Sequence, residues 1–88
     1  MIKSFSHKGL ERFFLKGSSV GIQAKHTKKL RFQLSALDAA RQIDDLDLPG
    51  YRLHPQRQGI WSITVSANWR LTFEFFDGNV YVLTYLIN

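Results

Sequence analysis

Apolar and polar residues alternate along much of the second half of the chain. In residues 61–66 the odd positions are apolar and the even positions carry hydroxyl groups. In residues 69–75 the odd positions are again apolar, and the even positions are Arg70, Thr72 and Glu74. A period of two is typical of half-buried antiparallel strands. We therefore predict a sheet with one apolar face turned to a core and one polar face available for function.

A turn between the last two strands sets their predicted register. The dipeptide Asp77-Gly78 favours a type I′ turn, because both central residues of that turn take positive φ. A two-residue loop at this position pairs Phe73 with Val82 on the core face. It also pairs Arg70 with Tyr85 on the polar face.

The turn that joins residues 61–66 to the next strand has two possible lengths. A two-residue loop would set Val65 opposite Arg70 and mix the two faces, since a slip of one residue reverses every side chain. We therefore expect a three-residue loop over residues 66–68, with Asn68 in the left-handed conformation. That loop aligns Val65 with Trp69.

The first half of the chain predicts one strand and two helices. Residues 3–5 suit a short strand, and Ser6 suits the N-cap of a helix that ends near Lys16. Apolar residues at helical spacing predict a second helix over residues 24–42. A turn at Pro49-Gly50 leads into a strand over residues 51–54 and then a tight basic loop.

These elements predict a two-layer α+β fold. The order is β-α-α-β-β-β-β, with two helices packed on one face of a twisted, mostly antiparallel sheet. Residues 1–88 are expected to form a single domain. The uncovered face would gather four side chains in one basic concavity, namely His54, Arg57, Arg70 and Tyr85.

Composition narrows the chemistry. The chain has no cysteine, which excludes disulfides and thiolate catalysis, and its three histidines lack helical pairing, so we expect neither a metal nor a cofactor. No apolar run approaches the ~20 residues of a membrane span. The first residues lack the apolar segment of a signal peptide, so the expected location is cytoplasmic, with no membrane partner.

The net charge of +5 is unevenly distributed. Residues 12–37 contain no acid, and neither do residues 48–73. Such segregation attracts polyanions. The cations that we expect to bind RNA or the ribosome are Lys25, Lys28, Lys29, Arg52 and Arg57. For each of the three lysines taken singly, a solvated helix face is the better interpretation.

Three segments together resemble one family. Residues 51–55 (YRLHP), 59–65 (GIWSITV) and 68–73 (NWRLTF) closely resemble the HigB toxins of the RelE superfamily, and residues 1–5 are similar to the start of that family. The resemblance implies a ribosome-dependent endoribonuclease that cuts messenger RNA in the ribosomal A site. It also implies a HigA-like helix-turn-helix antitoxin, with DNA contacted only through the antitoxin complex.

Cleavage by the neighbouring 2′-hydroxyl needs a base, an acid and cations around the phosphorus. Arg70 is the first candidate for phosphate binding, because a guanidinium fork matches phosphate oxygens. Its alternative role is a cross-strand partner of Glu74 or Tyr85. His54 is the candidate base or acid, because imidazole is the side-chain type suited to proton transfer near neutral pH; without the resemblance it would be an ordinary histidine at a strand end. Arg57 lies where the resemblance implies a basic residue, commonly lysine, and Tyr85 is a second candidate for proton transfer.

The remaining aromatic and imidazole side chains are expected to serve the fold. His7 and His26 are predicted to be surface residues, and the alternation places Trp61 and Trp69 in the core. Members of the family end in an Asp-Tyr-His-like tail, whereas this chain ends at Asn88, so we expect slower cleavage. The alternative function is a catalytically weakened homologue that binds antitoxin and ribosome. A stand-alone DNA-binding domain lacks support, since there is no recognition-helix pattern.

Overall fold

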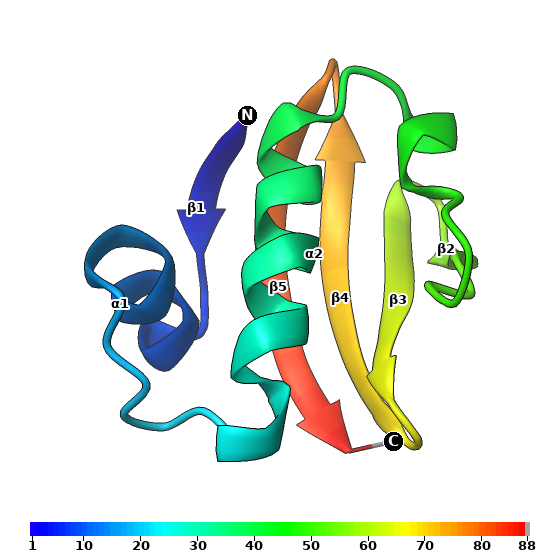
Figure 1. The fold of residues 1–88 in the computed structure, drawn as a ribbon. Coiled ribbons are helices and arrows are strands. Elements are labelled where there is room, and N and C mark those ends of the chain that lie inside the picture. Colours follow the sequence, from blue (N-terminus) through cyan, green and yellow to red (C-terminus); the bar gives the residue numbers. More distant parts are fainter. Residues whose placement is uncertain (88) are drawn as a thin grey trace.

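The computed structural model of the chain describes residues 1–87 (Figure 1). The strands are β1 (Ile2–Phe5), β2 (His54–Arg57), β3 (Ile60–Ser66), β4 (Trp69–Phe76) and β5 (Asn79–Ile87). The helices are α1 (Lys8–Lys16) and α2 (Thr27–Ala39), with the 3₁₀ turns η1 (Ala24–His26) and η2 (Ile43–Leu46). The predicted order of strands and helices is confirmed. No helix in the described range is long and apolar enough to cross a membrane.

The strands form one mixed sheet in the order β1-β5-β4-β3-β2. Strand β1 runs parallel to β5, and the other neighbours are antiparallel. Figure 1 shows α2 lying across one face of the sheet, with α1 beside β1. The α+β class and the mostly antiparallel sheet are therefore confirmed.

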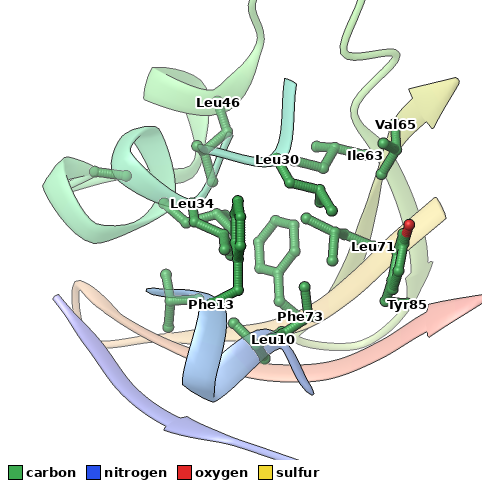
Figure 2. Close-up of a cluster of buried hydrophobic side chains, with 14 residues drawn as sticks. Leu10, Phe13, Leu30, Leu34, Leu46, Ile63, Val65, Leu71, Phe73 and Tyr85 are labelled. Atoms are coloured by element: carbon green, nitrogen blue, oxygen red, sulfur yellow. The ribbon is translucent and has the colours of Figure 1, made fainter. Parts of the chain in front are cut away.

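The core lies between the helices and this face of the sheet. Leu10 from α1 and Leu34 from α2 meet Leu71 and Phe73 from β4 in one buried cluster (Figure 2). Each of these four side chains is almost completely shielded from water. The alternation of β4 therefore turns its odd positions to the core, as predicted, and its even positions to the opposite, polar face.

Helix α1 begins one residue later than predicted. Its N-cap is His7, whose Nδ1 accepts a hydrogen bond of 3.0 Å from the backbone N–H of Leu10. The predicted cap at Ser6 is wrong, because the Ser6 N–H donates to the carbonyl of Val82 at 2.8 Å and extends the pairing of β1 with β5. The imidazole thus takes the capping role that a hydroxyl or carboxylate usually fills.

The second predicted helix is divided. A 3₁₀ turn precedes α2, and α2 ends at Ala39 rather than at residue 42. The Asp45 carboxylate accepts backbone N–H groups of Arg41 and Gln42, which draws the chain out of the helix and into η2. These donors hold the pKa of Asp45 below its ordinary value.

The β4–β5 hairpin confirms the predicted turn. Asp77 and Gly78 have φ values of 53° and 77°, as a type I′ turn requires. The pairing of Phe73 with Val82 is also confirmed.

Beyond that pair the register of β5 shifts by one residue. Leu83 has no partner in β4, Thr84 faces Thr72, and Tyr85 faces Leu71. The predicted pairing of Arg70 with Tyr85 is therefore wrong, and Arg70 faces Leu86 instead. The bulge lets the Thr72 and Thr84 hydroxyls hydrogen-bond to each other on the polar face.

The β3–β4 turn also contains a bulge. Ser66 pairs with Trp69, and the irregularity falls between Thr64 and Ser66. The predicted three-residue loop is wrong, since residues 67 and 68 form the turn and Ala67, not Asn68, has positive φ. The bulge restores the alignment on the core face, so that the faces do not mix.

The segment before β3 differs from the predicted strand and loop. Residues 51–53 are irregular, and β2 covers residues 54–57, which were predicted mainly as loop. The Tyr51 carbonyl accepts the Thr64 N–H at 2.7 Å, and Arg52 then turns the chain with a φ of 51°. Pro55 is tolerated because β2 is an edge strand.

Candidate functional site

Arg70 occupies the middle of the polar face. Its Nε is buried and has no hydrogen-bond partner in residues 1–87. Its Nη1 lies 3.5 Å from the Ser62 hydroxyl, and no Asp or Glu among the described residues lies within 4.0 Å of its guanidinium. A buried donor without a partner costs about 1–3 kcal/mol. The site therefore holds a cation that no carboxylate of the described residues neutralises through an ion pair.

Ser62 holds the polar face together beneath Arg70. Its side chain is fully buried and accepts a hydrogen bond of 2.8 Å from the Gln56 amide. Ser62 pairs with Thr72, which in turn pairs with Thr84. A row of hydroxyl groups thus crosses β3, β4 and β5 next to the guanidinium.

Two hollows flank Arg70. The larger has a volume of about 500 Å³. It lies beside residues 64–66 of β3, which extend beyond the part of β3 that pairs with β2. Side chains of Lys29, Arg52, Thr64, Ser66 and Asn68 line it together with Arg70. The smaller, of about 100 Å³, is lined by Gln56, Arg70, Thr72, Thr84, Leu86 and Ile87. Three cations and no acid line the larger hollow, a composition that favours a phosphate-bearing ligand.

His54 and Arg57 lie on β2, at the edge of the same face. His54 is exposed and pairs with Ser62, which places it at the β2 end of the hydroxyl row, two strands from Arg70. Arg57 pairs with Ile60, whose β4 partner is Glu74. Glu74 is four residues from Arg70 along the strand, roughly 14 Å. His54 is therefore the nearer of the two to Arg70.

Tyr85 lies on the other face of the sheet. Only 3% of it is exposed, and Figure 2 shows it among the buried apolar side chains. Its hydroxyl lies 2.6 Å from Nδ1 of His26 and 3.4 Å from the Gln23 N–H, which donates to it. Burial raises the pKa of this phenol. The predicted position of Tyr85 in the concavity with Arg70 is wrong, because the Leu83 bulge turns it to the core.

His26 is a buried residue whose burial was not predicted from the sequence. It is 1% exposed, although it was predicted at the surface. Its Nε2 lies 3.0 Å from the Ser66 hydroxyl, and its ring meets Trp69 edge-on at 5.3 Å. Burial, and then the charge of Lys25, lower the pKa of His26. The signal was present, because His26 precedes Leu30 by four residues, the spacing of the α2 core stripe.

The buried pair formed by His26 and Tyr85 positions one wall of the larger hollow. His26 begins the turn into α2, and Ser66 lines the hollow. The hydrogen bond between them joins the start of α2 to the β3–β4 turn. Lys29, the third residue of α2, lines the same hollow as Arg70.

The predicted binding cations divide into groups. Lys29 and Arg52 join Arg70 at the larger hollow, while Lys25 and Lys28 are exposed on the outer side of the helical layer. Arg57 lies at the far edge of the polar face. Among residues 1–87, no three side chains of His, Asp or Glu lie together in a way that could hold a metal ion.

Comparison with known proteins shows which family this chain resembles. Residues 3–87 match the sequence model of a family described as the RelE-like toxin of the type II toxin-antitoxin system HigB. A protein of Proteus vulgaris named endoribonuclease HigB is similar over 88 residues, with 48% identity. The alignment covers 97% of this chain and 96% of that relative.

Proposed function

The chain belongs to the HigB-like toxins, RelE-like toxins of type II toxin-antitoxin systems, and we propose that it is an endoribonuclease that cuts messenger RNA in the ribosomal A site. The name of the Proteus vulgaris relative supports the nuclease activity. The observation that carries the proposal for this chain is Arg70, a partly buried cation with an unpaired Nε beside a hollow lined by two further cations.

The reaction proposed for this face is attack by the 2′-hydroxyl on the adjacent phosphorus. The 2′-oxygen forms a bond to phosphorus, the bond to the 5′-oxygen breaks, and a cyclic phosphate remains on the upstream fragment. The fork of Arg70 holds non-bridging oxygens and stabilises the charge that grows on them. Ser62 and Gln56 keep the guanidinium in place from below.

Proton transfer in this scheme belongs to His54. His54 takes the proton of the 2′-hydroxyl, and a proton from water goes to the leaving 5′-oxygen. His54 is exposed on the hydroxyl row that contains Ser62, and imidazole exchanges protons near neutral pH. Arg57 contributes positive charge at the rim, since a guanidinium does not give up its proton.

The partners follow from the family. The proposed antitoxin is a HigA-like helix-turn-helix protein that holds the toxin inactive, and DNA is contacted only through that complex. The proposed substrate is messenger RNA on the ribosome, so the expected compartment is the cytoplasm. No cofactor takes part in the scheme.

The test replaces Arg70 by alanine. Ribosome-dependent cleavage of a defined messenger is expected to fall at least tenfold, about 1.4 kcal/mol of transition-state stabilisation. Arg70→Lys keeps the charge without the fork and should recover only part of the rate. Arg12→Ala, on the exposed side of α1, is the matched control and should cleave normally.

The same variants can be tested in cells by mapping the new 5′ ends of transcripts after expression of each variant is induced. The wild-type chain should create ends within codons, and Arg70→Ala should not. A folded Arg70→Ala variant that cleaves at the wild-type rate would refute the proposed site. A wild-type chain that binds ribosomes and leaves no new ends would instead be a binding module.

A further inference from the structure

The outer side of the helical layer carries a stripe of three lysines and a phenylalanine. Lys28, Lys29 and Phe32 lie in α2 at the spacing i, i+1 and i+4, Lys25 lies in η1 just before that helix, and the four residues border one hollow. All four are exposed, and they border a shallow hollow of about 420 Å³. We call these four residues the basic-aromatic stripe. Among the described residues none of the three lysines lies within 4.0 Å of a carboxylate, so no ion pair neutralises the stripe.

The fold makes no use of the Phe32 ring. It is 63% exposed, while the core of α2 is formed by Leu30, Leu34 and Leu37 on another side of the helix. Within residues 1–87 the ring has no aromatic or cation–π partner, whereas the Phe13 ring is buried and lies 5.7 Å from the guanidinium carbon of Arg31. An exposed aromatic ring among lysines is the arrangement that proteins use to bind single-stranded nucleic acid.

Lys29 makes the stripe continuous with the Arg70 site. Its side chain borders both the hollow beside Phe32 and the larger hollow beside Arg70. Phe32 lies three residues further along α2, about 4.5 Å along the helix axis. One ligand can therefore occupy both hollows and contact the same lysine.

We propose that the basic-aromatic stripe binds the single-stranded part of the substrate RNA that flanks the cleaved phosphodiester, with Phe32 stacking on a base. Lys28 and Lys29 then contact the phosphates on either side of that base. This inference rests on the proposed function and adds the path that the substrate takes across the protein. A ligand that alternates flat rings with phosphates uses both components of the stripe, whereas an acidic peptide would use only the lysines.

The experiment measures binding of a short, fluorescently labelled single-stranded RNA in which 2′-O-methyl groups prevent cleavage. Fluorescence anisotropy with the purified full chain at low salt gives the dissociation constant. Phe32→Ala is expected to weaken binding at least fivefold, and Phe32→Trp to restore it, because any aromatic face can stack on a base. Phe76→Ala is the matched control, since Phe76 is 67% exposed and lies beside the β4–β5 turn.

Lys28→Ala provides a second measurement on the same stripe. Removal of one phosphate contact should reduce the slope of log affinity against log salt by about 0.7, the value for a single-stranded ligand. Wild-type affinity in a folded Phe32→Ala variant would overturn the inference. So would a loss of antitoxin binding by Phe32→Ala with RNA binding intact, which would assign the stripe to the antitoxin.

The test of the stripe is separable from the test of the proposed function. Binding is read without cleavage here, whereas the Arg70 variants are read by cleavage. If Phe32→Ala binds RNA normally while Arg70→Ala loses cleavage, the stripe is overturned and the proposed function stands. If Phe32→Ala loses RNA binding while Arg70→Ala cleaves normally, the Arg70 site fails and the surface still binds RNA.

Discussion

Replacing Tyr85 by phenylalanine removes one oxygen atom from the interior, and we expect it to destabilise the fold without slowing cleavage. The hydroxyl is the partner of His26 Nδ1 at 2.6 Å and accepts the Gln23 N–H at 3.4 Å. Both contacts lie on the core side of the sheet, away from Arg70. The substitution therefore separates a structural role of the phenol from the catalytic role that its sequence position suggested.

The expected loss of stability depends on the contacts that remain in the Tyr85→Phe variant. The phenyl ring keeps its packing against Trp69, with ring centroids 4.9 Å apart, so no cavity forms. The imidazole of His26 is left buried with one nitrogen unpaired, at a cost of about 1–3 kcal/mol. In a domain of this size each kcal/mol lowers Tm by about 4–8 °C. The expected loss is a sizeable part of a total stability of roughly 5–15 kcal/mol.

Urea unfolding followed by tryptophan fluorescence measures the effect, since Trp69 lies against Tyr85. The midpoint should fall while the m value stays the same. Tyr81→Phe is the control: Tyr81 is half-buried on the polar face opposite Glu74, and its loss should cost less than about 0.5 kcal/mol. Wild-type stability of Tyr85→Phe, or lost cleavage in the folded variant, would refute the reasoning.

Two predictions concern histidines. His54→Ala should lower ribosome-dependent cleavage about a hundredfold or more and remove one limb of its pH profile, since it deletes the proposed proton-transfer group; an unaltered profile in a folded variant would exclude that role. For His26, burial and then Lys25 lower the pKa in the folded state, so only the unfolded state takes up a proton just below the ordinary value of about 6.5. The resulting stability is present above that pH and is lost as the pH falls below it. Urea titrations between pH 7 and 5 should show this slope in the wild-type chain and a flatter one in His26→Gln, and equal slopes would contradict it.

The period-two pattern was sufficient to predict the core and the class of fold. Leu71 and Phe73 are apolar because they face the helices, and Arg70 faces away from them because it lies between apolar neighbours. The Asp77-Gly78 turn was predictable because few other residues accept two successive positive φ values. These features depend on local chemistry alone.

The bulges were not predictable in the same way. Leu83 is an apolar residue that suits either face, so nothing in its own chemistry marks it as unpaired. The neighbouring Thr84 gave one indication of the bulge, because regular strand pairing would have placed Thr84 in the core opposite Leu71. The bulge avoids that burial and exchanges the positions of Thr84 and Tyr85.

The site was accordingly predicted in part. Arg70 and His54 share the polar face because alternation governs both strands. Tyr85 was misplaced by the bulge, and His26 was missed because burial of an imidazole depends on distant partners. The convergence of Lys29 on Arg70 is likewise tertiary, since 41 residues separate them in sequence and the hollow joins them only in the folded sheet.

The parallel pairing of β1 with β5 has a consequence for synthesis of the chain. The Val80 N–H donates to the Met1 carbonyl at 2.9 Å, so β1 pairs with a strand that is translated more than 70 residues after it. At a translation rate of about 5–20 residues per second, some 4–15 s pass between the synthesis of β1 and that of β5. β5 also lies beside β4, so the strand that carries Arg70 gains its second neighbour only after residues 79–87 have been translated. A chain interrupted before residue 79 therefore lacks both the partner of β1 and one neighbour of the strand that carries Arg70.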